Sequence, residues 1–280
     1  MTLAQPAELP AARRQSVLSR WSRGLLRGSA EYLPAVLLLV ALVGLWELLV
    51  HILHARPYML PAPSRVWRAF LEVRGLLPGH IRTTMTEAIL GLGYAAVIGV
   101  VLAIVIAAVP LVRRVLYPLL VVSQTLPMVV LAPLLIVWFG FGMTPKIIVV
   151  ALVGFFPIVV STADGLAGAD REMVGLVRSM GANRLQELRY VLIPSALPAF
   201  FAGLKIAATY AVLAAVIGEW VGASSGLGIF ITRSQTAFRV DRVFVAVVVV
   251  ALSSIALFAA VHLMARLASP WMYVHEQEND

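Results

Sequence analysis

Three residues near the first apolar segment have the types and spacing of a metal site. Glu47, His51 and His54 fall at i, i+4 and i+7, so on a helix they share one face and could bind zinc or another divalent ion. A fourth ligand is not evident in the sequence. Polar residues also often lie where a span leaves the membrane, so we predict no metal site here and keep zinc binding as the alternative.

A second group resembles the parts of a serine hydrolase. Residues 222–226 read Gly-Ala-Ser-Ser-Gly, which is the spacing of a nucleophile elbow, and His262 lies in the next apolar segment. An elbow requires a strand–turn–helix setting, and the sequence offers no acid placed to orient His262. We therefore predict a glycine- and serine-rich turn and no catalytic residues, with an intramembrane hydrolase as the rival interpretation.

The amino-acid composition indicates the environment of these residues. Of 280 residues, 61% are hydrophobic and 13% are charged, whereas a soluble domain has about a quarter charged residues. The mean hydropathy of +0.93 describes the whole length, which is typical of a polytopic membrane protein. The net charge of +8 comes from arginines scattered between apolar runs, so it does not indicate a nucleic-acid partner.

Two residue counts exclude further chemistry. The chain has no cysteine, which excludes disulfides, thiolate metal ligands and a cysteine nucleophile. Both lysines, Lys146 and Lys205, are followed by isoleucine, whereas a phosphate-binding P-loop needs Gly-Lys followed by Ser or Thr. If ATP drives this protein, a partner must bind it.

The apolar segments predict an all-α fold with six transmembrane helices, since about 20 apolar residues cross the bilayer core. The expected spans are 33–53, 86–109, 115–139 (interrupted by Pro127 and Pro133), 147–163 (bent by Pro157), 199–221 and 243–264. Between the first two spans, Val66, Trp67, Phe70 and Leu71 predict a short amphipathic helix. No internal repeat is evident.

Arginine and lysine bias favours cytoplasmic N- and C-termini. This orientation places 12 basic residues inside and 9 outside, with Lys205 left within a span. The predicted organisation is a basic cytoplasmic segment 1–32, a transmembrane domain 33–266 and a cytoplasmic tail 267–280. The basic segment could form an interfacial helix or a loosely tethered tail.

The cytoplasmic loop 165–198 is too polar to span and has a helical pattern. Asp170 can cap a first helix that has Met173, Leu176, Val177 and Met180 on one face. Gly181 then breaks the chain, and Asn183 with Gln186 forms a capping box for a second helix. We expect its apolar side to hold Leu185, Leu188 and Leu192, its charged side Arg184, Glu187 and Arg189, and Pro194 and Pro198 to end it. Such a projecting pair of helices could dock in a groove of a cytosolic partner or lie on the bilayer surface.

This loop resembles the EAA loop of permease subunits in binding-protein-dependent ABC importers. The resemblance rests on residues 180–183 (Met-Gly-Ala-Asn) and 190–198 (Tyr-Val-Leu-Ile-Pro-Ser-Ala-Leu-Pro). Residues 124–127, 132–134, 138–142 and 218–228 are similar to the branch that serves sulfonates, taurine, nitrate, pyrimidine precursors and riboflavin. One departure is that Gly175-Leu176-Val177 replaces the Glu-Ala-Ala that names the loop, so docking should depend on Gly181 and the helix after it.

The resemblance implies a type I importer permease fold and a set of partners. Two copies of this chain would form the pore, two ATPase subunits would bind ATP and Mg²⁺ and grip the loops, and an extracytoplasmic binding protein would deliver the solute. The chain itself would need no cofactor and would not be an enzyme. The residues expected to contact the ATPase are Gly181, Ala182, Asn183, Arg184, Leu185, Gln186 and Leu188.

Polar residues in the spans indicate the path and the gate. We expect Ser123, Gln124, Thr125, Met128, Tyr210 and Glu219 to line the translocation path or gate, although helix packing uses the same residue types. The resemblance places Glu219 at the start of the outer gate. A secondary transporter is the alternative class, but the carboxylates Glu47, Glu87, Asp164 and Glu219 are expected near span ends rather than at mid-membrane.

The transported solute is only weakly indicated, because a separate binding protein selects it. Basic residues are scarce within the spans, and a dedicated anion path would be expected to show more than Lys205. We therefore favour a vitamin or a pyrimidine- or flavin-type heterocycle over a sulfonate, taurine or nitrate.

Overall fold

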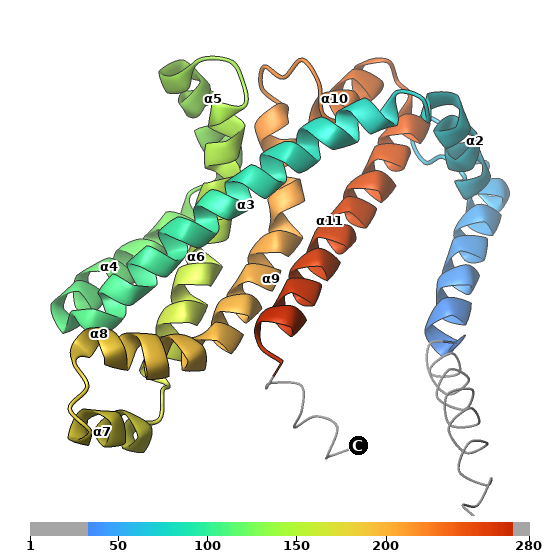
Figure 1. Cartoon of the computed structure of the whole chain (residues 1–280). Coiled ribbons are helices and arrows are strands. Elements are labelled where there is room, and N and C mark those ends of the chain that lie inside the picture. Colours follow the sequence, from blue (N-terminus) through green and yellow to red (C-terminus); the bar gives the residue numbers. More distant parts are fainter. Residues whose placement is uncertain (1–32, 271–280) are drawn as a thin grey trace, which may run out of the picture. The chain divides into compact units, whose positions relative to one another are not determined.

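The computed structural model describes residues 33–270, and every regular element in that range is a helix, as expected. The helix Leu33–Ile52 comes first. In chain order the later elements are α2 (Pro63–Val73), α3 (Leu77–Ala108), α4 (Pro110–Thr125), α5 (Met128–Phe139), α6 (Thr144–Ala167), α7 (Arg171–Ser179), α8 (Arg184–Glu187), the π-helical turn Leu188–Leu192, α9 (Ile193–Glu219), α10 (Leu227–Thr236) and α11 (Val240–Ala268) (Figure 1). The predicted segment 1–32 and residues 271–280 of the tail lie outside the described residues.

The chain divides into two units, residues 1–65 and 66–280. In the first unit, few side chains of the helix Leu33–Ile52 are buried. The carboxylate of Glu47 accepts hydrogen bonds from the backbone N–H and the hydroxyl of Ser64, at 3.0 and 2.8 Å. Glu47 therefore binds the turn that begins α2, and the predicted short helix after this turn is confirmed.

Within residues 33–270, five helices are long and apolar enough to cross a membrane, and the pair α4–α5 makes a sixth candidate. The pair is bent by 97°, so the expected third span is not the single interrupted helix that we predicted. Leu126 has an extended backbone, with φ −72° and ψ 122°, because the ring of Pro127 disfavours the helical conformation in the residue before it. Pro133 lies inside α5 without ending it.

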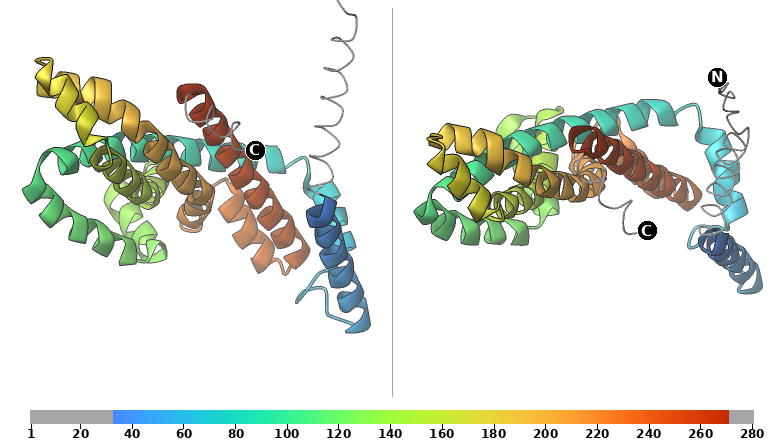
Figure 2. Two further views of the ribbon diagram at one scale, coloured as in Figure 1. Left: turned by 90° about the horizontal axis from the view of Figure 1, so that it is seen from below. Right: turned by 60° about the horizontal axis from the view of Figure 1, so that its bottom comes forward.

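Small side chains allow α9 to pack at the centre of the second unit. This helix contacts α3, α6 and α11, and it lies between α6 and α11 in both views of Figure 2. Its Ala207, Ala208 and Ala215 are completely buried. A Cβ on Gly203 would lie 2.5 Å from the carbonyl oxygen of Pro157 on α6. Membrane helices associate through such close approach, because lipid tails are as apolar as leucine.

The two prolines expected to end the second helix of loop 165–198 do not end it. Instead, α8, the π-helical turn and α9 form one helical run of 36 residues, Arg184–Glu219. Pro194 lies in the first turn of α9, directly after the π-helical turn, and a proline is tolerated there because it interrupts no established α-helical hydrogen bond. Pro198 lies inside α9. One continuous helix therefore connects the loop to the last residue of α9, Glu219.

Candidate functional site

The loop 165–198 has the local structure that the sequence predicts at its turns. The side chain of Asp170 accepts a hydrogen bond from the backbone N–H of Glu172 at 2.8 Å and caps α7. Gly181 has φ +86°, a left-handed conformation that glycine adopts without steric cost. Asn183 and Gln186 form the capping box of α8, with reciprocal bonds of 2.8 and 2.9 Å.

The apolar side chains of this loop are presented on its surface. Met180 is 79% exposed and Leu185 is 72% exposed. Met173 and Leu176 on α7 are also exposed, while Ala182 and Leu188 are half-buried. An apolar face that the chain leaves uncovered is typical of a surface that contacts a partner.

Glu187, which we predicted on the charged side of the second helix, forms an ion pair with the first helix of the loop. Glu187 is buried, and its carboxylate accepts two hydrogen bonds from the guanidinium of Arg178, at 2.7 and 2.8 Å. These bonds raise the pKa of Arg178 above its usual value. On the charged side predicted for Arg184, Glu187 and Arg189, the carboxylate of Glu187 therefore joins α8 to α7.

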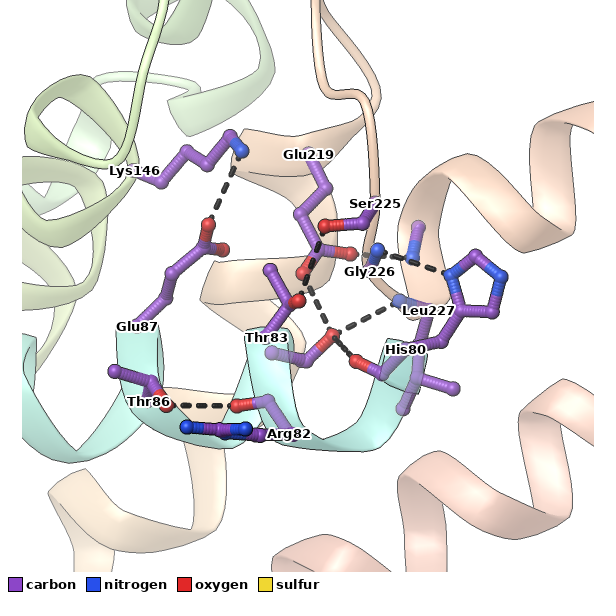
Figure 3. Close-up of polar contacts among 12 residues, drawn as sticks. His80, Arg82, Thr83, Thr86, Glu87, Lys146, Glu219, Ser225, Gly226 and Leu227 are labelled. Atoms are coloured by element: carbon purple, nitrogen blue, oxygen red, sulfur yellow. Dashed lines mark hydrogen bonds and ion pairs between the residues drawn. The ribbon is translucent and has the colours of Figure 1, made fainter. Parts of the chain in front are cut away.

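A second group of polar residues lies buried at the other end of α9. Glu219 is completely buried, and its carboxylate accepts a hydrogen bond of 2.6 Å from the hydroxyl of Thr84 on α3. It also accepts a hydrogen bond from the backbone N–H of Gly228 in α10. Glu219 therefore contacts two helices other than its own (Figure 3).

The N-terminus of α10 is capped by side chains from α3 and α9. The backbone N–H of Gly226 donates to Nδ1 of His80 at 3.0 Å, and that of Leu227 donates to the Thr84 hydroxyl at 2.9 Å. With the Gly228–Glu219 bond, three successive amides have partners that the start of a helix cannot supply itself. We call His80, Thr84 and Glu219 the α10 cap.

Glycine at position 226 makes room for the α10 cap. Its φ of +124° and ψ of 165° belong to a backbone region that is essentially restricted to glycine. A Cβ at this position would lie 2.2 Å from the carboxyl carbon of Glu219. The carboxylate can therefore reach the first turn of α10 only because residue 226 has no side chain.

A buried ion pair lies beside the cap. Nζ of Lys146 on α6 is 3.1 Å from Oε1 of Glu87 on α3, and both side chains are nearly inaccessible to solvent. We expected Glu87 near the start of a span at residue 86, but α3 begins at Leu77, so the residue lies well inside the helix. Intramembrane charges of this kind are costly and usually functional.

Two of the expected path residues hydrogen-bond within their own helix instead of to the α10 cap. Ser123 and Thr125 donate to carbonyl oxygens of their own helix, those of Leu120 and Val122, at 2.7 and 2.8 Å. These residues, with exposed Gln124 and half-buried Met128, flank the bend between α4 and α5.

Two other polar residues of α9, Tyr210 and Lys205, are more exposed than Glu219. Tyr210 is half exposed. Lys205 is also partly exposed, and its ammonium has no ion-pair partner among residues 33–270.

The structure gives other partners to the residues of the metal alternative. Nδ1 of His51 and of His54 lies 2.8 and 3.0 Å from the carbonyl oxygens of Glu47 and Ile52. The Glu47 carboxylate binds Ser64. In residues 33–270, no three His, Cys, Asp or Glu side chains are grouped so that they could hold a metal ion.

Residues 33–270 do not contain the strand–turn–helix setting that the hydrolase alternative requires. The hydroxyl of Ser225 is hydrogen-bonded to that of Thr83 at 3.0 Å, and the ring of His262 stacks on Phe258 within α11. The described range 33–270 has no strand that could precede an elbow. Residues 222–226 form the predicted turn, which leads into α10.

The chain is similar to proteins of known class. Residues 95–273 match the family model described as binding-protein-dependent transport system inner membrane component. The formylaminopyrimidine transport permease of Halalkalibacterium halodurans is 35% identical over 247 residues, covering 88% of this chain and 98% of that protein. The riboflavin transport permease of Chloroflexus aurantiacus is 35% identical over 243 residues (85% and 89%), and the taurine transport permease of Escherichia coli is 28% identical over 240 residues (83% and 87%).

A solved structure supports the fold. A chain of the inward-facing methionine ABC transporter superposes with a TM-score of 0.60 at 19% identity, covering 67% of this chain and 94% of that chain.

Proposed function

The chain belongs to the family of binding-protein-dependent transport system inner membrane components, and from this premise we propose the subunits with which it acts and the role of each. As a member it is a multi-pass membrane protein and a permease subunit of an ABC importer. We propose that two copies form one pore, that two ATPase subunits bind ATP and Mg²⁺, and that an extracytoplasmic binding protein delivers the solute. In this arrangement both termini are cytoplasmic.

One observation carries the coupling role of loop 165–198, namely that its exposed apolar face is attached to a helix that continues without a break to Glu219. ATPase subunits that grip residues 181–186 and 188 would therefore displace the start of that helix. A ligand can move a two-state protein only by preferring one state, and ATP-bound ATPase subunits would prefer the state in which the two loops are close together.

The path and the gate follow from the same assignment. We assign residues 123–125, Met128 and Tyr210 to the path, where exposed or half-buried polar groups and a half-buried thioether would give a solute weak, exchangeable contacts. We assign Glu219 to the outer gate, where its support is the bonding of the carboxylate to α3 and α10.

For the solute we propose a flat heterocycle such as a formylaminopyrimidine or riboflavin. The support is twofold: these are the solutes named for two relatives at 35% identity, and the spans hold few basic residues to line an anion path. Taurine, a sulfonate or nitrate is the alternative, since a taurine permease is also related at 28% identity.

The experiment is reconstitution of the chain with ATPase and binding-protein partners in proteoliposomes. Gly181→Asp should leave expression intact but abolish uptake and binding-protein-stimulated ATP hydrolysis, since a side chain is strained at φ of +86° and would obstruct the proposed close docking contact. The matched control is Gly75→Asp, at an exposed glycine whose added Cβ would meet nothing within 4 Å.

Normal uptake in Gly181→Asp would refute the docking role. Uptake that is driven by an ion gradient and insensitive to vanadate would refute the ATP-driven mechanism. Competition by taurine or nitrate, but not by riboflavin or a formylaminopyrimidine, would overturn the solute assignment.

A further inference from the structure

Most hydrogen bonds of the α10 cap join residues that are far apart in the chain. Thr84 and Glu219 are 135 positions apart, and Leu227 and Gly226 lie 143 and 146 positions from their partners Thr84 and His80. These bonds fasten the first turn of α10 to α3 and α9 at one buried place (Figure 3).

Thr84 is the centre of this arrangement because its hydroxyl serves two elements at once. The hydroxyl donates to Oε1 of Glu219 at 2.6 Å and accepts from the backbone N–H of Leu227 at 2.9 Å. Thr84 is completely buried, so water cannot replace a bond that is lost there. One oxygen atom therefore connects α3, the end of α9 and the start of α10.

Glu219 is also the last residue of the helical run that begins at Arg184. The chain therefore has the loop 165–198 at one end of this run and the α10 cap at its other end (Figure 1). A shift of the run reaches the segment 220–226 in two ways: through the backbone after Glu219, and through the cap that holds the far end of this segment.

We propose that His80 and Thr84 are positioning residues, which lock α10 to Glu219 so that a displacement at the cytoplasmic loop moves the segment 220–226. This inference rests on the proposed function, because it takes the ATPase subunits as the source of the displacement. Without the cap, α9 can still move, but residues 220–226 no longer follow as one body with α10. The variant complex hydrolyses ATP without moving its outer segment.

The test uses the absence of cysteine from the chain. Ser224→Cys places a single thiol at an exposed position of the segment 220–226. The complete complex with ATPase and binding protein is reconstituted, and modification by a membrane-impermeant maleimide is timed without nucleotide and after vanadate trapping of ADP. The ratio of the two rates reports movement of the segment, and it requires no knowledge of the solute.

Thr84→Val removes the hydroxyl but keeps the shape of the side chain. The loss of a bond to a buried carboxylate should shift the balance between the two conformations of segment 220–226 by about tenfold or more. We therefore expect the rate ratio to fall by about tenfold, so that it approaches one. Stimulated ATP hydrolysis should persist. The matched control is Thr86→Val, because the Thr86 hydroxyl donates only to the carbonyl oxygen of Arg82 in its own helix, at 2.7 Å.

A second pair of variants covers the case in which Thr84→Val does not assemble. Thr84→Ser should retain the parent ratio because it restores the hydroxyl. His80→Leu, at the half-buried edge of the cap, should lower the ratio because the Gly226 amide loses its acceptor.

Three results would overturn the proposal. The first is a rate ratio in Thr84→Val or His80→Leu that equals that of the parent. The second is a variant in which ATP hydrolysis is lost together with the change in labelling rate, and the third is a rate ratio of one in the Ser224→Cys parent. The parallel loss would mean that the cap only supports the fold. If the parent complex shows no stimulated ATP hydrolysis at all, the proposed function fails, and this inference fails with it.

Discussion

Replacing Gly226 by alanine should disrupt the α10 cap and destabilise the protein strongly. The new Cβ would lie 2.2 Å from the carboxyl carbon and Oε1 of Glu219, so the carboxylate must leave its place. It would then lose its bonds to Thr84 and Gly228. Each hydrogen bond to a charged group contributes about 1.5–3 kcal/mol.

The backbone adds a second cost, because φ of +124° and ψ of 165° at residue 226 are strained for alanine by about 1–3 kcal/mol. The two costs together reach about 4–9 kcal/mol. For a chain of this size, even the lower limit corresponds to a fall in melting temperature of roughly 8 °C or more.

The assay is thermal unfolding in detergent, followed by the loss of monodisperse protein. The control is Gly93→Ala, which is the same substitution at an exposed position of α3 where a Cβ would meet nothing within 4 Å. It should be neutral or stabilise the helix by about 0.5–1 kcal/mol. If Gly226→Ala melted within about 3 °C of the parent, the cap would not hold α10 as described.

Two further predictions concern ion pairs outside the spans. Arg178→Met should detach α7 from Glu187 and increase proteolysis of loop 165–198, whereas Arg171→Met, in the same helix, should not; equal cleavage of the two variants would contradict the pairing. The hydrogen bond from Arg239 lowers the pKa of Glu72 below its usual 4.5, so this pair stabilises the fold above pH 4.5 and its contribution is lost as the pH falls through the lowered pKa. Melting temperatures measured from pH 7 downward should show this loss in the parent and not in Glu72→Gln, and identical profiles would refute it.

Features that depend on neighbouring residues could be predicted from the sequence. The Asp170 cap, the left-handed Gly181 and the capping box of Asn183 and Gln186 all follow from residues within three or four positions of one another. The apolar spans follow from length and composition. The resemblance to permease subunits, which supplied the type of fold, agrees with the family match and with the solved structure.

Helix ends at prolines were predicted less well. The second span was expected to begin at residue 86, yet α3 already has Pro78 in its first turn, where its missing N–H has no intrahelical role. Pro194 and Pro198 were expected to end a helix that in fact continues. Pro127 follows an extended residue and stands at the 97° bend between α4 and α5, and Pro110 likewise follows the extended Val109 between α3 and α4. Local sequence does not distinguish these cases, since packing decides which residues remain helical.

The α10 cap could not be derived from the sequence. His80 and Thr84 were not among the candidates, because nothing near them indicates partners more than 130 positions away. One signal was present: Gly226 stands before α10 without a side chain that could cap it. The first amides of that helix therefore needed acceptors from elsewhere in the fold, and the buried Glu219 was the nearest acidic residue in the chain.

The alanines buried around α9 have a consequence for the proposed transport cycle. An alanine side chain has no rotamers, so neither its burial nor its displacement costs side-chain entropy. At Ala207, Ala208, Ala211, Ala214 and Ala215, α9 can therefore shift against its neighbours without side-chain rearrangement, and the larger buried side chains that have to repack are Phe201, Leu204, Val212 and Val216. Most of the alanine contacts of α9 therefore remain usable in both states of the proposed cycle, because no rotamer has to change at those positions.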